Sequence, residues 1–295
     1  MATQEKPMVV AIGEILWDVF PEERKIGGAP ANFVYYASRL GGKAALISRI
    51  GMDFLGIEAL AICHTTGLTT DFIQKDEIHP TGKVRVELDK KGVPVFEIEK
   101  DAAWDFLAEE EALFSLVGKS EVVYFGTLAQ RQPESRKTIR GLLGSADCLK
   151  VLDLNLRFPH FDKEVVETSL EIADILKLNS DELKIVSRQF SLQGTESEIL
   201  NALLQKYSLR LVALTLGSEG GRILSREQES YHPGYMVSVV DTVGAGDAFA
   251  AALIQGILAD MDLDKVNGFA NKVASFVCTK KGAWVDISDL IRPAW

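Results

Sequence analysis

Short apolar runs recur along the chain and alternate with stretches whose apolar residues follow a helical spacing. The runs at residues 8–13 and 44–50 have the length and the branched side chains of buried strands. Further candidate strands lie at residues 122–125, 149–154, 175–178 and 211–216. A helical spacing is found at residues 31–40, 164–173 and 196–207. Strands that alternate with helices predict crossover connections and a mostly parallel sheet covered by helices on both faces.

The segment at residues 83–98 departs from this alternation. Residues 83–88 (KVRVEL) alternate charged and apolar side chains, a turn at residues 89–92 (DKKG) follows, and residues 93–98 form a second candidate strand. The pattern predicts a β-hairpin with one polar and one apolar face. Two interpretations stay open at this point, namely an ordinary edge hairpin and a lid that covers a pocket.

The composition is that of a globular protein. Of the 295 residues, 47% are hydrophobic and 25% are charged, which suits one large α/β domain with a small appendage. The formal net charge of −10 argues against nucleic acid or an anionic membrane as the main partner, because both require clustered Lys and Arg. ATP is compatible with this charge, since backbone amides and one or two local cations are enough to hold phosphate.

The chain shows neither a metal-binding nor a targeting pattern. Its cysteines, Cys63, Cys148 and Cys278, are far apart and form no CxxC pair, so we expect no zinc site and no disulfide framework. Residues 1–7 are polar, and the apolar run that follows is too short for a signal peptide or a membrane span. A cytoplasmic location is therefore expected.

Residues 239–249 (VVDTVGAGDAF) carry the most informative functional pattern. The pattern predicts a strand end, a turn with two glycines and the start of a helix. Such a helix start binds anions, because its first amides point outward without partners and glycine lets a ligand approach the backbone. Asp247 lies in the predicted first turn, where a carboxylate serves either as a catalytic group or as a helix cap.

Two common nucleotide-binding motifs fail when they are tested against the sequence. A GxGxxG fingerprint would need glycine at position 249, which is Phe249. The GKS sequence at residues 118–120 would need glycine at position 113, which is Leu113, and a predicted strand follows it where a Walker A loop requires a helix. Neither a dinucleotide fold nor a Walker A loop is therefore expected.

The segment DTVGAGDAF, at residues 241–249, resembles the C-terminal signature of the ribokinase-like (PfkB) carbohydrate kinases. In that family the aspartate after GAG is the catalytic base, and the amides of the turn form an anion hole. The resemblance therefore implies that Asp247 is the base and that Gly244, Ala245 and Gly246 form the anion hole.

The early part of the chain is similar to the sugar-binding segment of the same family. Asp18 precedes the GGAPAN turn, in which Gly27, Gly28 and Asn32 match the family's GG-x-x-x-N pattern. These groups suit a polyol, because Asp18 accepts hydrogen bonds from hydroxyls and Asn32 both donates and accepts them. The resemblance implies that they bind the sugar.

The segment DLNLR, at residues 153–157, resembles a D-x-N-x-R strand end of fructokinases and ketodeoxygluconate kinases. The resemblance implies that Arg157 lies beside the substrate or the transferred phosphate. The chain then departs from the family pattern, because residues 158–160 are Phe-Pro-His where Leu-Trp is typical. A surface salt bridge is the alternative role for Arg157.

Further matches belong to the nucleotide side and to cations. The family's N-x-x-E motif, T-x-G-x-x-G turn and adenine-pocket position are matched by Asn179, Glu182, Thr215, Gly217, Gly220 and Asn271. Within this set, the resemblance implies that Glu182 holds Mg²⁺ through water. In some relatives a loop pair binds a monovalent cation, which would be K⁺, and the aligned residues are Asp241, Val243, Val277, Lys280, Gly282 and Asp286.

As a whole, the resemblance implies a three-layer α/β/α fold with a mostly parallel sheet over residues 1–295. A small β-sheet lid would come from about residues 14–26 and 81–106. The implied activity is phosphorylation of a sugar hydroxyl by direct in-line transfer from ATP with Mg²⁺. Lids of this family often pair between subunits, so we also expect a homodimer.

The implied substrate is D-fructose, which would be converted to fructose 6-phosphate. The segments GEILWD, GGAPANF and DAAWD, at residues 13–18, 27–33 and 101–105, resemble fructokinases more than ribokinases. The alternatives are 2-keto-3-deoxygluconate kinase or another sugar kinase of the family. Two rival classes are a catalytically silent, sugar-sensing relative, disfavoured by the intact GAGD, and a dinucleotide oxidoreductase, disfavoured by the failed GxGxxG.

Overall fold

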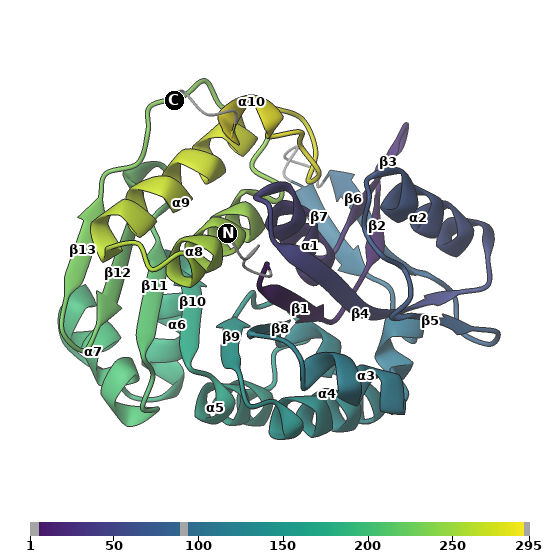
Figure 1. Ribbon diagram of the computed structural model, residues 1–295, viewed down its shortest axis with the longest axis horizontal. Coiled ribbons are helices and arrows are strands. Elements are labelled where there is room, and N and C mark those ends of the chain that lie inside the picture. Colours follow the sequence, from purple (N-terminus) through teal and green to yellow (C-terminus); the bar gives the residue numbers. More distant parts are fainter. Residues whose placement is uncertain (1–5, 89–93, 292–295) are drawn as a thin grey trace, which may run out of the picture.

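The computed structural model describes residues 6–88 and 94–291, and a nine-stranded sheet forms its centre (Figure 1). The strand order is β13-β12-β11-β10-β9-β8-β1-β4-β5. The bounds are β1 Met8–Ile12, β4 Lys43–Gly51, β5 Ile73–Asp76, β8 Val122–Gly126, β9 Leu149–Asp153, β10 Ile175–Asn179, β11 Leu211–Thr215, β12 Gly221–Ser225 and β13 Glu229–His232. From β11 to β5 all neighbours are parallel, and only β12 and β13 add in antiparallel fashion. The predicted mostly parallel sheet is confirmed.

Helices cover both faces of this sheet, as Figure 1 shows. One face carries α1, α2, α8 and α9, and the other carries α3 to α7. The bounds are α1 Ala29–Arg39, α2 Phe54–Thr65, α3 Glu111–Val117, α4 Pro133–Ser145, α5 Lys163–Ile172, α6 Ser180–Gln189, α7 Glu196–Lys206, α8 Ala245–Leu258, α9 Leu263–Cys278 and α10 Ser288–Ile291. Along residues 6–88 and 94–291, no helix combines the length and the apolar character needed to cross a membrane.

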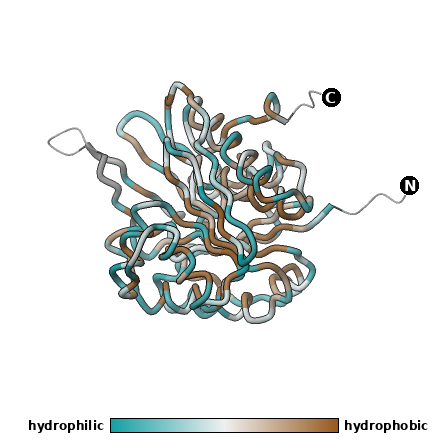
Figure 2. Tube along the Cα trace, turned by 90° about the vertical axis from the view of Figure 1, so that its left-hand side faces the viewer, coloured by the Kyte–Doolittle hydropathy of each residue, from teal (hydrophilic) through white to brown (hydrophobic). Residues whose placement is uncertain are grey.

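The central strands read as continuous apolar runs because both of their faces are buried. In β1, Val9 and Ala11 belong to one hydrophobic cluster, whereas Val10 and Ile12 belong to the cluster on the opposite face. All four are inaccessible to solvent. Figure 2 shows the resulting hydrophobic centre and the more polar periphery.

A smaller, four-stranded sheet has the order β3-β2-β6-β7. Its strands are β2 Leu16–Val19, β3 Arg24–Gly27, β6 Gly82–Leu88 and β7 Pro94–Ile98. The β2–β3 and β6–β7 pairs are antiparallel, and β2 pairs with β6 in parallel. The predicted hairpin is therefore confirmed as β6 and β7, while the turn predicted at residues 89–92 lies outside the described residues.

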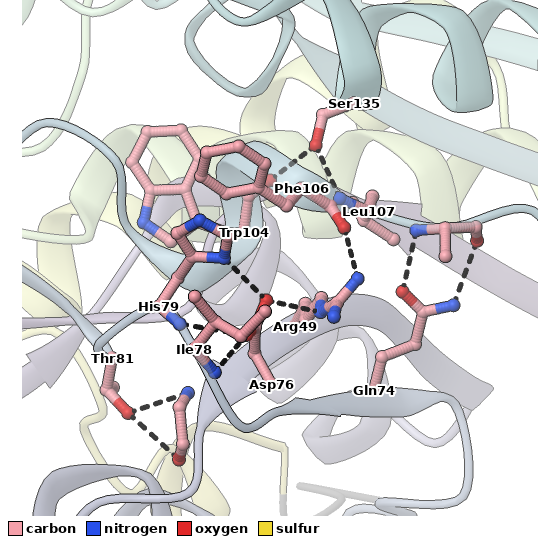
Figure 3. Close-up of polar contacts among 12 residues, drawn as sticks. Arg49, Gln74, Asp76, Ile78, His79, Thr81, Trp104, Phe106, Leu107 and Ser135 are labelled. Atoms are coloured by element: carbon pink, nitrogen blue, oxygen red, sulfur yellow. Dashed lines mark hydrogen bonds and ion pairs between the residues drawn. The ribbon is translucent and has the colours of Figure 1, made fainter.

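The connection from β5 to the smaller sheet is fixed by a buried carboxylate (Figure 3). Asp76 accepts hydrogen bonds from the backbone N–H groups of Ile78 and His79 at 2.7 and 2.8 Å, and it pairs with Arg49 Nε at 2.9 Å. The His79 ring stacks on Phe106 with a centroid distance of 3.6 Å. The short link therefore holds one edge of the smaller sheet in place relative to the main sheet.

The prediction of a strand end at residues 239–240 was wrong, because residues 233–242 form an irregular segment. The two valines there are each 63% exposed, and Val240 N–H donates to the carbonyl of Cys278 at 2.8 Å. Their β-branched side chains favour a strand, but no neighbouring strand is available to pair with them in the described chain. Strands β12 and β13 were not predicted, because their polar edge sequences lack a buried-strand pattern.

Candidate active site

The GAGD turn forms the N-terminus of α8. Gly244 is the N-cap residue and has a left-handed backbone with φ 78°, and a Cβ atom there would lie 2.7 Å from the carbonyl oxygen of Ala283. Glycine is therefore required at this position for both conformation and space. Asp247 occupies the first turn, and the helix has no side-chain cap. The alternative interpretation of Asp247 as a helix cap is wrong.

The Asp247 carboxylate instead contacts a residue far away in the sequence. Its Oδ2 accepts a hydrogen bond from Asn32 Nδ2 at 2.8 Å. The Oδ1 of Asn32 accepts in turn from Trp284 Nε1 at 2.8 Å, which fixes the orientation of the amide. Trp284 stacks on Tyr35 with a centroid distance of 4.8 Å. Sequence reasoning missed Trp284, because a single tryptophan in a loop carries no pattern.

A cavity of about 570 Å³ opens in front of Asp247. Its lining combines residues of the smaller sheet with residues at the ends of the central strands. Four of the predicted sugar-side residues line it together with Asp247: Asp18, Gly28, Asn32 and Arg157. Gly27 lies directly behind Asp18, since a Cβ atom there would be 2.7 Å from the Asp18 Oδ2. The structure thus brings the predicted sugar residues together.

A second cavity, of about 790 Å³, lies on the other side of the turn. The predicted nucleotide residues that line it are Asn179, Thr215, Gly217, Gly220 and Asn271. Ala245 and Gly246 line it as well. The two cavities share Asn179, Thr215, Thr242 and Gly246 in their walls, so they meet at the GAGD turn.

Glu182 closes a capping box at the start of α6. Its Oε2 accepts from the N–H of Asn179 at 2.9 Å, and its Oε1 accepts from the N–H of Leu156 at 2.8 Å. No cluster of three or more His, Cys, Asp or Glu is arranged around a common point in the described ranges. Both carboxylate oxygens of Glu182 are thus engaged by backbone amides, and its water-mediated role toward Mg²⁺ stays a prediction.

Comparison with known proteins places this geometry in a family. The profile of the pfkB family carbohydrate kinases matches residues 9–289. The chain belongs to this family. A protein of Pyrococcus horikoshii named as a sugar kinase is 34% identical over 300 residues, which cover 94% of this chain and 92% of that protein. The Arabidopsis thaliana protein named "Probable fructokinase-5" is 28% identical over 305 residues, which cover 94% of this chain and 93% of that protein.

Solved structures of similar proteins share the fold of this carbohydrate kinase. The Pyrococcus horikoshii protein in complex with ATP superposes with a TM-score of 0.82 at 32% identity, covering 96% of each chain. The Vibrio cholerae fructokinase in its fructose, ADP and calcium ion bound form superposes with a TM-score of 0.82 at 22% identity, again covering 96% of each chain. A double mutant of that fructokinase, in its fructose, ADP and potassium ion bound form, superposes with a TM-score of 0.80 at 21% identity, and 96% of each chain is covered. The ribokinase-like fold and the sugar-kinase class predicted from the sequence are confirmed.

The pKa of Asp247 in this kinase is shifted upward. Burial, followed by the negative charge of Asp153, raises it to about 6, while Lys177, the hydrogen bond from Asn32 and Arg157 act in the opposite direction. A carboxylate with such a pKa is ionised at neutral pH and still accepts a proton more readily than an ordinary aspartate. That is the property required of a general base.

Two further carboxylates have raised pKa values in the cavity in front of Asp247, which we call the sugar-side cavity after the predicted sugar residues that line it. Burial raises the pKa of Asp18 to about 6, and the charges of Arg157 and Lys25 oppose the shift. Burial raises the pKa of Glu14 to about 7, against its own backbone hydrogen bond and the charge of Arg157. Glu14 is 3% exposed and lines the cavity. Sequence reasoning missed Glu14 as a site residue, although it stands inside the GEILWD segment.

The two loops predicted to hold a monovalent cation lie side by side in the kinase. The carboxylate of Asp241 accepts from the N–H of Gly282 at 2.9 Å, and the N–H of Asp241 donates to the carbonyl of Cys278 at 3.3 Å. The ammonium group of Lys25 is 3.8 Å from the same carboxylate. The other predicted ligands lie on these loops or at the end of α9: Val243, Val277, Lys280 and Asp286.

Proposed function

We propose that this kinase transfers the γ-phosphoryl group of ATP to O6 of D-fructose, with Asp247 as the general base. The observation that supports the proposal most is that the two cavities meet at the GAGD turn. A hydroxyl held near Asp18 and Asn32 in the first cavity would face a γ-phosphate that reaches the turn from the second cavity. In-line phosphoryl transfer depends on this kind of positioning.

The roles of the individual groups follow from their places. Asp247 accepts the proton of the attacking hydroxyl, and the amides of Gly244 and Gly246 stabilise charge on the phosphoryl oxygens. The Ala245 amide already donates to the carbonyl of Thr242 at 3.2 Å. Arg157 lies on the rim of the same cavity, where it contributes positive charge near the transferred group. Magnesium, when bound, neutralises charge on the ATP phosphates, and Glu182 orders water in its shell.

Fructose fits the charge of the sugar-side cavity better than an acidic sugar does. Three carboxyl groups, those of Glu14, Asp18 and Asp247, face this space. The cations that line it are Arg157 and Lys177; the charge of Lys177 is balanced by Asp153, and its ammonium group lies against Gly246 of the GAGD turn. The carboxylate of 2-keto-3-deoxygluconate would meet repulsion from the ionised carboxylates of Asp18 and Asp247, whereas a neutral ketose would accept and donate hydrogen bonds. The fructokinase relatives also support a ketose.

A screen of about a dozen sugars with ATP and Mg²⁺ tests the proposal. We expect fructose to give a higher kcat/KM than ribose, adenosine or 2-keto-3-deoxygluconate. A preference for 2-keto-3-deoxygluconate of tenfold or more, which is about 1.4 kcal/mol in transition-state binding, would overturn the fructose assignment. Sugar binding without phosphorylation of any sugar would show instead that the protein is a catalytically silent, sugar-sensing relative.

The smaller sheet serves as the lid of the sugar-side cavity in this proposal and forms the contact of a homodimer. Val84 on β6 and Ile98 on β7 both line the cavity, so closure of this sheet would exclude water from the sugar. Within the described residues, β3 and β7 are edge strands, which offer unpaired backbone groups to a second copy. A fully active monomer in light scattering would remove the dimer from the proposal.

The paired loops around Asp241 and Gly282 bind a monovalent cation that orders the anion hole. Backbone carbonyls and one carboxylate are the ligands that such an ion requires, and Lys25 would have to withdraw from Asp241 when the ion binds. The potassium-bound Vibrio cholerae fructokinase supports the idea. Turnover that is equal in potassium, sodium and tetramethylammonium buffers would remove this part of the proposal.

A further inference from the structure

Lys177 places a buried positive charge beneath the GAGD turn. It lies near the carboxyl end of β10, directly across from Asp153 on β9 in the parallel register. Its Nζ is 2.8 Å from Asp153 Oδ2 and 3.1 Å from Oδ1. The residue is 6% exposed, yet it is part of the wall of the sugar-side cavity. A lysine inside an apolar run of residues 175–178 is a signal that the sequence already contained.

Stability alone does not explain this ion pair. Removing two charges from water is costly, and a well-packed apolar pair of similar volume is often as stable or more stable. The neighbours Leu176 and Leu178 are fully buried apolar residues, so the strand itself has no need of a charge. Buried charges whose pKa values are perturbed concentrate at functional sites.

The surroundings of the pair keep the lysine charged and in place. Tyr124 donates its hydroxyl hydrogen to Asp153 Oδ2 at 2.8 Å, so the carboxylate holds Lys177 and Tyr124 together. An ammonium group has three N–H donors, and the two hydrogen bonds that Lys177 makes within the described residues both go to the carboxylate of Asp153. A donor therefore remains for a ligand in the cavity that Lys177 lines.

The ammonium group of Lys177 lies next to Gly246, and this position indicates which ligand it would meet. A Cβ atom on Gly246 would lie only 3.1 Å from Lys177 Nζ, so nothing but the glycine backbone separates the charge from the first turn of α8. Gly246 borders both cavities, the one in front of Asp247 and the one lined by the nucleotide-side residues. The positive charge of Lys177 therefore lies at the boundary of the two cavities, where a group transferred from one to the other would pass.

We propose that Lys177 is a catalytic residue whose ammonium group donates a hydrogen bond to a non-bridging oxygen of the phosphoryl group during transfer. The inference rests on the proposed function. The bond from phosphorus to the ADP oxygen breaks and the bond to the sugar oxygen forms, while the hydroxyl proton goes to Asp247. Lys177 keeps its three protons throughout, and Asp153 and Tyr124 act as positioning residues for it.

The test compares binding of ground-state and transition-state ligands. The double variant Asp153→Asn/Lys177→Met removes the pair without leaving a single buried charge, and Asp153→Asn alone keeps the lysine. Calorimetry would measure affinities for ADP, for fructose, and for ADP with aluminium fluoride and fructose, which imitates the transferred phosphoryl group. We expect the affinities of the double variant for ADP and for fructose to stay within about threefold of wild type. Its affinity for the aluminium fluoride complex should be about 30-fold or more weaker, and kcat should be lowered by about 10²- to 10³-fold. The Asp153→Asn variant keeps the ammonium group, so its kcat and its affinity for the aluminium fluoride complex should fall less than those of the double variant.

Several outcomes would overturn the proposal. One is a double variant with kcat within about threefold of wild type, and another is an equal weakening of all three affinities, as a purely structural role predicts. Should the double variant not fold, Asp153→Asn/Lys177→Gln keeps a polar pair at the two positions and removes both charges, and near-normal kcat there would be equally decisive. If wild-type protein phosphorylates no sugar, the proposed function itself fails, which is a different result from an active but unchanged variant.

Discussion

Replacing Asp247 by asparagine removes a negative charge and a proton acceptor from the sugar-side cavity while it keeps the shape of the side chain. We expect kcat to fall by about 10²- to 10⁴-fold, the usual range for loss of a general base, which corresponds to about 3–5 kcal/mol of transition-state stabilisation. The affinity for ATP should change little, because Asp247 lines the sugar-side cavity and is absent from the lining of the second cavity, which holds the predicted nucleotide residues.

The same substitution should change the stability of the fold far less. The N-cap of α8 is Gly244 and no side chain caps this helix, so the variant loses no capping bond. Losing a carboxylate from a first helical turn costs about 0.3–1 kcal/mol through the helix dipole. Burial opposes the charge of Asp247, as its raised pKa shows, so part of even this cost is offset. The amide oxygen can still accept the hydrogen bond from Asn32.

A coupled assay of ADP release with fructose measures kcat, and urea unfolding measures stability. Asp264→Asn is the matched control, because Asp264 is also an acidic residue in a first helical turn, that of α9, and it lines neither cavity. We expect the control to change stability by a similar small amount and to leave kcat at the wild-type value.

A kcat above about one third of wild type in Asp247→Asn would refute the assignment, since less than about 1 kcal/mol would then be lost. A loose phosphoryl-transfer transition state needs little activation of its nucleophile, so part of any loss would come from a misplaced hydroxyl. Asp247→Ala separates the two effects in part, because it removes positioning as well as proton acceptance and should be slower than Asp247→Asn.

Other measurements follow from the buried carboxylates. As the pH is lowered through about 6, kcat/KM for fructose should fall with a logarithmic slope between one and two. The reason is that Asp247 and Asp18 both have pKa values raised to about 6 and both must be ionised. A pH-independent kcat/KM through this range would contradict the site. The wild-type protein should lose stability between pH 4.5 and about 7, because folded Glu14 retains a proton that the unfolded chain releases above the ordinary glutamate pKa of 4.5. In Glu14→Gln this loss, measured by unfolding at each pH, should be smaller by up to about 3 kcal/mol. Asp76→Ala should lower the free energy of unfolding by about 3 kcal/mol, because Arg49 and two backbone amides lose their acceptor, and a loss below about 1 kcal/mol would contradict a fixed connection to the smaller sheet.

Patterns that are local in the chain could be predicted from the sequence. The buried strands at residues 8–13 and 175–178 are identifiable because a parallel strand covered on both faces must be apolar throughout. The GAGD turn is identifiable because left-handed backbone at Gly244 and the free amides of a helix start depend on only a few neighbouring residues. Local preference also misled where no partner strand exists, as it did at residues 239–240.

Contacts between distant segments were decided only by the tertiary structure. The hydrogen bond between Asn32 and Asp247 joins residues 215 positions apart, and nothing near either one in the sequence requires the other. The pairing of Lys177 with Asp153 depends on the register of two parallel strands connected through a helix, which no local pattern fixes. The raised pKa of Glu14 likewise arises from burial by elements that the chain supplies far from it. The sequence thus determined which groups are present and which turn opens a helix, whereas folding determined which charges share a site, because desolvation and register are properties of the packed whole.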